Sequence, residues 1–303
     1  MLYLPQARQP GFKQGFARSA SASAYPNRWK GLIGAWVPAL GPAGVTLRDV
    51  SVKKNHGTLT NMAPASDWVI GGNSRLPGYV LDFDKLDDHI NVPDADYLTP
   101  SSAAMTHIVW LKLRNFSGSL AGKPPGIMAK FDESANQRSW LFGMADDIGG
   151  ANEGKLRIVI SSMVVFFSGA VVLSNLAMPL NVWTQIVSVW DGAARTVTFY
   201  IGGKDVGSTV TAGTVPVTVA NNTLDMVLGA ETLAGGADRT MDGQIGLALL
   251  YDRALNAAEI WFHYETPLGI FQRRPITISK APAAAAGTIL PQIVTAYHSI
   301  LQD

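Results

Sequence analysis

Cysteine is absent from the 303-residue sequence. Disulfide bonds and thiolate metal sites are therefore excluded, and cysteine usage leaves the redox compartment open. Charged residues are also scarce, at 16% against a typical share of about 25%. A surface poor in charge indicates that partners cover part of it. Because the net charge is +1, no broad field is available to hold nucleic acid or an anionic membrane, and we expect neither as a partner.

Long apolar runs are absent as well. The longest, from Met163 to Leu173, is broken by Ser168 and Gly169 and is shorter than the roughly 20 residues that a spanning helix needs. The first 20 residues lack a continuous apolar core, so we expect no secretory signal and no export by the usual route.

Motifs of common enzyme classes are missing. Neither G-x-S-x-G nor G-x-x-x-x-G-K-[ST] occurs, and the five histidines are widely separated, which excludes serine-hydrolase, phosphate-loop and zinc sites. We interpret His56 as a loop residue bonded to backbone. A glycoside hydrolase needs two carboxylates about 5–10 Å apart. Asp82 and Asp84 have suitable i, i+2 spacing, as do many structural pairs, and the glutamates are isolated, so we expect no enzymatic activity.

A hairpin from Val182 to Ile201 is the clearest local structure. Its two arms alternate and are rich in β-branched and aromatic residues, as in half-buried strands. Asp191-Gly192 is expected to supply a turn with positive φ between them. A hairpin of this length is marginal alone, so we expect a larger sheet around it, with Trp183 in the core.

Short strands follow one another through most of the chain, separated by turns rich in Gly, Asn and Asp. With no helices between them, they predict an all-β antiparallel sandwich. One short C-terminal α-helix is expected, at about residues 257–265, where Asn256 and Glu259 form a capping box. We expect one domain over residues 31–266.

Four aspartates crowd a second predicted hairpin, Tyr79–Val92: Asp82, Asp84, Asp87 and Asp88. Clustered carboxylates suit a hard cation such as calcium. Alternatively, Asp87 and Asp88 favour the turn backbone, and the spacing matches no EF-hand. No cofactor is required under either interpretation.

Both ends of the chain look like extended arms, over residues 1–30 and 267–303. They show no clear period and are rich in small residues, so they cannot build a core alone. We expect them to be ordered by contact with other molecules or with the body of the domain. The expected partner-binding residues are Tyr3, Phe12, Phe16, Ile289, Ile293 and Tyr297. The block Val164–Phe167 is expected to be either buried core or an interface.

Residues 31–266 resemble the laminin-G-like, concanavalin A-like lectin jelly rolls. The segments that carry the resemblance are GLIGAW, NHGTLTN, YVLDFDKLDDHINVP, VWTQIVSVWDGAARTVTFYIGGKDVG and DGQIGLALLYDRALNAAEI. Two positions depart from the family pattern: Lys85 stands where the family has glycine, and Gly246 where it has an acidic residue. The loss of that acidic residue weakens the expectation of calcium. The resemblance implies a jelly roll that binds glycans, proteins or copies of itself.

Three functions follow as hypotheses from this resemblance and the arms. The first is a phage virion structural protein, most closely a capsid decoration protein, whose arms bind neighbouring virion proteins and copies of itself. It would assemble in the host cytoplasm and leave by lysis. The second is a carbohydrate-binding tail or fibre module for host glycans, in which Trp110, Trp140 or Trp190 would stack on sugar rings. A glycoside hydrolase is the third.

Overall fold

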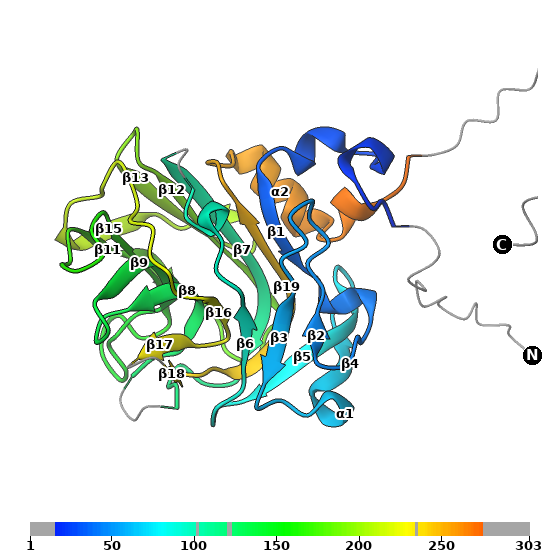
Figure 1. Ribbon diagram of the computed structural model, residues 1–303, viewed down its shortest axis with the longest axis horizontal. Coiled ribbons are helices and arrows are strands. Elements are labelled where there is room, and N and C mark those ends of the chain that lie inside the picture. The colour runs from blue at the N-terminus through cyan, green and yellow to red at the C-terminus, as the bar shows by residue number, and fades with distance from the viewer. Residues whose placement is uncertain (1–15, 101–102, 120–122, 234–235, 275–303) are drawn as a thin grey trace, which may run out of the picture. The chain divides into compact units, whose positions relative to one another are not determined.

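Two antiparallel sheets form a sandwich in the computed structural model, which describes residues 16–100, 103–119, 123–233 and 236–274 (Figure 1). The first sheet has the order β14-β13-β12-β7-β19-β5-β4, and β1 also pairs with β19. Its strands are β1 (Leu32–Trp36), β4 (Trp68–Gly72), β5 (Pro77–Asp84), β7 (Ala104–Leu113), β12 (Thr184–Asp191), β13 (Thr196–Ile201), β14 (Lys204–Asp205) and β19 (Asp242–Tyr251).

The second sheet has the order β15-β11-β10-β9-β8-β16-β6-β3-β2. Its strands are β2 (Thr46–Leu47), β3 (Gly57–Thr60), β6 (His89–Val92), β8 (Gly126–Asp132), β9 (Gln137–Met144), β10 (Lys155–Ser161), β11 (Gly169–Ala177), β15 (Ser208–Gly213) and β16 (Met226–Leu228). A small hairpin pairs β17 (Glu231–Leu233) with β18 (Gly236–Asp238). The predicted antiparallel jelly-roll sandwich is confirmed.

The main core lies between the two sheets, where apolar side chains of both meet. The predicted central hairpin is confirmed, since β12 and β13 pair from Ile186↔Ile201 to Asp191↔Thr196. Its turn differs from the prediction. Residues 192–195 form the loop, and the positive φ falls on Arg195 (55°), because the extra residues move the left-handed position to the end of the turn. Trp183 precedes β12 and is only half-buried, so its expected place in the core is wrong.

The predicted hairpin Tyr79–Val92 is also wrong in one respect. Both strands form, but β5 pairs with β4 and β19 in the first sheet, whereas β6 pairs with β3 and β16 in the second. Residues 85–88 therefore pass from one sheet to the other. A short polar turn between two alternating strands is compatible with either arrangement, so the local pattern does not separate them.

Two α-helices occur among the described residues: α1 (Pro64–Asp67), a single turn that the sequence did not reveal, and α2 (Ala257–Glu265). The predicted capping box of α2 is present, with Asn256 and Glu259 bonding reciprocally. Short 3-10 turns are η1 (Ala20–Ala22), η2 (Pro26–Trp29), η3 (Pro38–Leu40), η4 (Asp96–Leu98) and η5 (Gly269–Phe271). Neither α-helix is long and apolar enough to cross a bilayer.

The outer face of the first sheet is covered by α2, η5 and residues 16–30 (Figure 1). Trp29 is buried there against Phe271, with ring centroids 5.7 Å apart. Phe16 forms an antiparallel bridge with Gln272. Residues 16–30 and 267–273 thus contact the body of the domain, one of the two expected arrangements, and their aromatic and aliphatic side chains complete a second apolar cluster on this sheet. Residues 1–15 and 275–303 lie outside the described residues.

Candidate functional site

A cleft of about 530 Å³ opens beside η4, and we call it the loop-end cleft. It is lined by Asp96, Tyr97, Thr99, Pro100, Ala103, Thr218, Val219, Asn221 and Asp252. These residues come from η4 and the chain after it, from the loop before β16, and from the end of β19. The cleft is therefore assembled only when both sheets are in place.

The turn η4 is fixed from below by the core. Leu98 is fully buried, and its carbonyl accepts a hydrogen bond of 2.9 Å from Nε1 of Trp140. The N–H groups of Leu98 and Thr99 bond back to Ala95 and Asp96, which closes the turn. Anchored in this way, the turn presents Asp96 to solvent and leaves Tyr97 half-buried.

Polar groups of four kinds line the loop-end cleft. Asn221 Nδ2 donates to Asp96 Oδ1 at 2.9 Å. Thr99 Oγ1 is buried and makes no hydrogen bond to the residues that the structure describes. Burial raises the pKa of Tyr97, with the charge of Asp49 adding to the effect. The Tyr97 ring packs against the main core, and Lys53 Nζ lies 4.6 Å from its centroid. The carboxylate, the amide and the hydroxyl are groups that can bond to the hydroxyl groups of a sugar.

The three tryptophans predicted to stack on sugars are all buried, so that prediction is wrong for these residues. Trp140 and Trp190 lie between the sheets, and Trp110 lies beneath α2, stacked on Tyr264. Each indole N–H donates to a backbone carbonyl, of Leu98, Pro216 and His263 respectively. Their rings serve packing because the pleat turns these positions toward one or other apolar cluster.

The four predicted calcium ligands separate into two groups. Asp84, Asp87 and Asp88 each bring a carboxylate oxygen within 4.8 Å of the others. Asp82 instead accepts from Arg114 at 2.7 Å and from Gln244 at 2.7 Å, on the first sheet. Burial raises the pKa of Asp88 to about 6, and repulsion from neighbouring aspartates adds to this against a hydrogen bond from the Asp84 N–H. The three-residue cluster has oxygen donors of the type that calcium prefers.

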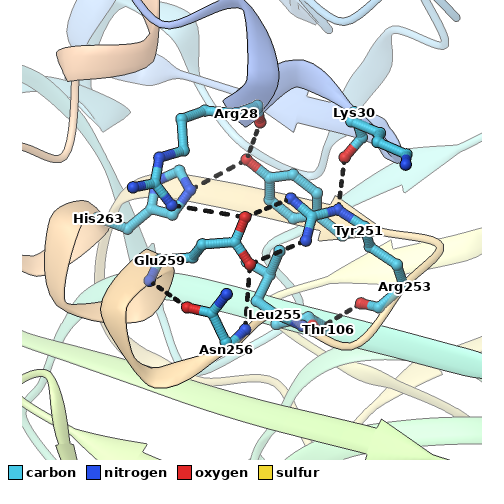
Figure 2. Close-up of polar contacts among 9 residues, drawn as sticks. All are labelled: Arg28, Lys30, Thr106, Tyr251, Arg253, Leu255, Asn256, Glu259 and His263. Atoms are coloured by element: carbon cyan, nitrogen blue, oxygen red, sulfur yellow. Dashed lines mark hydrogen bonds and ion pairs between the residues drawn. The ribbon is translucent and has the colours of Figure 1, made fainter.

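A partly buried network joins α2 to residues 28–30 (Figure 2). Arg253 forms a bidentate pair with Glu259 at 2.8 and 2.9 Å. Tyr251 Oη lies 3.0 Å from His263 Nε2 and donates to the carbonyl of Arg28. Burial lowers the pKa of His263 to about 3, so this ring is neutral at pH 7. These groups bond to one another and tie α2 to residues 28–30, so we interpret the network as a structural junction.

The predicted partner-binding residues are mostly outside the described residues: Tyr3, Phe12, Ile289, Ile293 and Tyr297. Phe16 is half-buried within its own domain. The apolar block Val164–Phe167 lies in the loop between β10 and β11, and Phe166 is 69% exposed there. The buried-core interpretation is therefore wrong for this loop, and an interface stays a prediction.

Sequence reasoning missed the loop-end cleft. Its residues are separated by more than 150 positions, and no local pattern links them. The signal that was present is the pair Asp96-Tyr97 between two strands, since polar and aromatic residues on loops frequently carry function.

The chain belongs to the concanavalin A-like lectin/glucanases superfamily, whose family model matches residues 83–261. A search of curated proteins found no match.

Solved structures share the fold at low identity. The binding domain of Paraclostridial Mosquitocidal Protein 1 has a TM-score of 0.54 and 13% identity, over 78% of this chain and 52% of that chain. Domain 4 of AbnA, a GH43 extracellular arabinanase from Geobacillus stearothermophilus in complex with arabinotriose, has a TM-score of 0.51 and 16% identity, over 76% and 96%. Botulinum neurotoxin type C, whose cell entry depends on two ganglioside molecules, has a TM-score of 0.52 and 11% identity, over 80% and 52%. This chain thus spans about half of the mosquitocidal and neurotoxin chains.

Proposed function

We propose that the protein is a non-catalytic carbohydrate-binding module that holds an oligosaccharide in the loop-end cleft. The observation that carries the proposal is the combination in one cleft of the half-buried Tyr97 ring, the Asp96–Asn221 pair and the unpartnered hydroxyl of Thr99. A sugar hydroxyl placed near Thr99 would give that buried oxygen a hydrogen-bond partner. The new bond would offset the free-energy cost of keeping the oxygen away from water without a partner.

The structural neighbours add support of a general kind. The arabinanase domain was solved with arabinotriose, and the neurotoxin interacts with gangliosides. Those ligands belong to those proteins, and low identity transfers only the fold. They make a polar cleft on this scaffold a reasonable place to look for a glycan.

A non-catalytic role fits Asp96, one of the two carboxyl groups that line the cleft. A general acid needs a carboxyl whose pKa is raised by burial. Asp96 is exposed and already accepts a hydrogen bond from Asn221. Release of reducing sugar from an oligosaccharide that the purified protein binds would overturn this part of the proposal.

A glycan array probed with the full chain tests the proposal. We expect binding to a restricted set of oligosaccharides, and loss of about tenfold or more in affinity for Asn221→Ala, because an amide that pairs with sugar hydroxyls is removed. Asn27→Ala is the matched control, since Asn27 is an exposed amide outside this cleft. No binding on the array, or equal loss in both variants, would contradict the proposal.

A second candidate is a virion structural role, namely a capsid decoration protein or a tail or fibre component. The observation that favours it is unpartnered surface at one edge of the second sheet. All six residues of β15 are exposed and uncharged, and the neighbouring loop exposes Phe166 and Phe167. An uncharged edge strand readily pairs with another chain. Such a protein would bind copies of itself and other virion proteins.

Deletion of residues 1–15 and 275–303 tests this second role. We expect the deleted form to keep the melting temperature of the full chain and to lose incorporation into particles. Normal incorporation would contradict the predicted role of Tyr3, Phe12, Ile289, Ile293 and Tyr297.

Calcium at Asp84, Asp87 and Asp88 stays a prediction. A thermal melt with calcium and with chelator tests it, because a ligand that binds only the folded state raises its stability.

A further inference from the structure

The strand β15 forms an open edge of the second sheet. Among the described residues it pairs with β11 alone, and it stands last in the strand order. All six of its residues are exposed. Its hydroxyl groups bond within the molecule, since Ser208 Oγ donates to the Val197 carbonyl at 2.6 Å and Thr209 Oγ1 to Asn175 Oδ1 at 2.8 Å. These bonds hold the strand in place and leave its outer backbone edge free to pair with another strand.

The other ends of the two sheets are protected in ways that β15 is not. The strand β14 has two residues, Lys204 and Asp205, and both are charged. The strand β2 also has only two residues. The strand β4 has five, of which Ile70 alone is fully exposed. Because short, charged or covered edges keep strands from pairing between molecules, β15 is the sheet end in the described part of the chain where this protection is missing.

Charge is absent from long stretches of sequence around this edge. No Asp, Glu, Lys, Arg or His occurs at residues 158–190 or 206–224, although charged residues make up 16% of the chain. More than half of the large apolar side chains that are exposed in the described residues belong to these two stretches. Among them are Phe166, at 69% exposed, and Val210 on β15, at 48%.

A hollow of about 490 Å³ connects the edge to the exposed loop between β10 and β11. Phe167 of that loop lines it together with Gly213 at the end of β15 and Val217 beyond it. Arg195 is the charged residue of this lining, and it donates to the carbonyl of Val215 at 3.3 Å. The loop and the edge strand thus form one nearly uncharged surface, of the kind that marks a protein–protein contact.

We propose that β15 pairs with β15 of a second copy of this chain, antiparallel and around a two-fold axis, so that the two second sheets become one continuous sheet. A surface that meets itself around such an axis brings its own charges opposite one another, and like charges directly opposite are destabilising. An uncharged edge is free of that repulsion. Val210, near the middle of the strand, packs against Val210 of the second copy.

The size of the contact sets its strength. A strand of six residues spans about 20 Å, and the loop between β10 and β11 adds apolar area beside it. Contacts of this size are small and belong to weak, reversible complexes. We therefore expect a dissociation constant on the order of 10 μM.

This interface is separate from the loop-end cleft and does not rest on glycan binding. It gives the contact between copies in the virion role a defined edge, but it forms in solution without a particle. Residues 16–30 and 267–273, near the two ends of the described chain, lie on the opposite side of the domain from β15 (Figure 1). A second copy is therefore the occupant that we assign to this edge.

Sedimentation velocity of the full chain from about 1 to 100 μM tests the self-association. We expect a reversible monomer–dimer equilibrium. Val210→Lys should weaken the dimer at least tenfold, because two lysines then face each other, and should leave the melting temperature unchanged at this exposed position. Val52→Lys is the matched control, since Val52 is 66% exposed away from β15, and it should associate like the wild type.

A charge-swap pair separates pairing from misfolding. Val210→Lys and Val210→Glu should each be monomeric, whereas their equimolar mixture should form a heterodimer at least as tight as the wild-type dimer. Only a contact of the strand with itself has this property.

Single cysteines locate the axis, because the chain has no cysteine of its own. Opposite residues of an antiparallel pair have Cα atoms about 4.5–5.5 Å apart, within the range of a disulfide. Under mild oxidation, Val210→Cys or Thr211→Cys should cross-link two chains at least tenfold faster than Ile70→Cys on β4. Ile70 is 71% exposed and serves as the control for a cysteine on another edge.

Four results would overturn the proposal. The wild type could stay monomeric over the whole concentration range, or Val210→Lys could associate as the wild type does. If the mixture of the two charge variants stays monomeric, β15 contacts something other than itself. If Ile70→Cys cross-links as fast as the β15 variants, the contact is not specific to this edge.

Discussion

The outer faces of the two sheets differ in how far other segments of the chain cover them. On the first sheet, α2, η5 and residues 16–30 cover a continuous apolar cluster, and the network of Figure 2 fastens them. On the second sheet, no helix covers the outer face among the described residues. A small apolar strip of Ala129, Phe131, Leu141 and Val159 lies there, and the loop Met163–Phe167 is exposed.

Ion pairs occur on both sides of the sandwich. On the second side, a cluster joins β10 to the β17–β18 hairpin: Glu231 Oε2 lies 3.1 Å from Arg239 and 3.7 Å from Arg157. Burial raises the pKa of Glu231 against the attraction of both arginines. Residues 16–30 and 257–271 thus cover the outer face of the first sheet, whereas no such layer covers the outer face of the second sheet among the described residues.

Phe→Ala substitutions on the two sides of the sandwich should give very different losses of stability. Phe271→Ala on the covered face should lower the free energy of unfolding by about 3–5 kcal/mol, because Phe271 is 1% exposed against Trp29. Phe166→Ala, on the open side, should change it by less than about 0.5 kcal/mol. Denaturant unfolding measures both. Equal losses would show that the loop Met163–Phe167 is covered too.

A substitution in the junction of Figure 2 should have the second-largest effect on stability. Glu259→Ala removes the capping-box side chain and the pair with Arg253, which together contribute about 2 kcal/mol. Burial opposes the Glu259 carboxylate, but bonds from Arg253 and Asn256 outweigh it and keep its pKa below the usual range. A lowered folded pKa gives stability that is present above about pH 4.3 and is lost as the pH falls further.

A melt series from pH 3 to pH 7 checks this. The wild type should lose stability more steeply than Glu259→Gln at the acid end. Glu153→Ala, at an exposed glutamate, is the control for the loss of a charge alone. If Glu259→Ala melts with the wild type, the junction does not hold the covered face.

The aspartate cluster should show the reverse pH dependence. The Asp88 pKa is raised to about 6, so its neutral form is favoured in the fold. Its stabilisation is present below about pH 3.9 and is lost as the pH rises to about 6. Asp88→Asn keeps the acceptor for the Asp84 N–H and should raise the stability at pH 7 by about 1–2 kcal/mol in chelator.

Calcium sharpens this prediction. If calcium binds the cluster, it should stabilise the wild type at pH 7 and leave Asp88→Asn unchanged. An identical response of the two proteins to calcium would remove the cluster as the binding site.

Substitution of Lys85 should have the smallest effect on the free energy of unfolding. It stands where the family has glycine, and its φ of 75° is in the left-handed region. Lys85→Gly should therefore raise the free energy of unfolding by about 0.5–1 kcal/mol. Lys85→Ala removes the same charge and keeps the unfavourable φ, so no gain is expected. A gain in both variants would assign the effect to charge.

Local signals predicted local structure well. The helix at residues 257–265 and the β12–β13 hairpin follow from the capping box and from alternation, which are read within a few residues. Gly246 also becomes intelligible: the β19–β7 register shifts there, and a Cβ would lie 2.7 Å from Leu76.

Features that depend on the stacking of the sheets could not be read in this way. The separation of β5 and β6 into different sheets, the burial of Trp190 and the half-burial of Trp183 are decided by long-range packing. The candidate site could not be predicted for the same reason, since Asp96, Asn221 and Asp252 meet only after folding.

The most direct test is a crystal structure of the full chain with the oligosaccharide that it binds most tightly on the array. The account predicts a sugar in the loop-end cleft, with hydroxyl groups bonded to Asp96, Asn221 and Thr99. A sugar bound instead on the outer face of the second sheet, with the loop-end cleft empty, would contradict it.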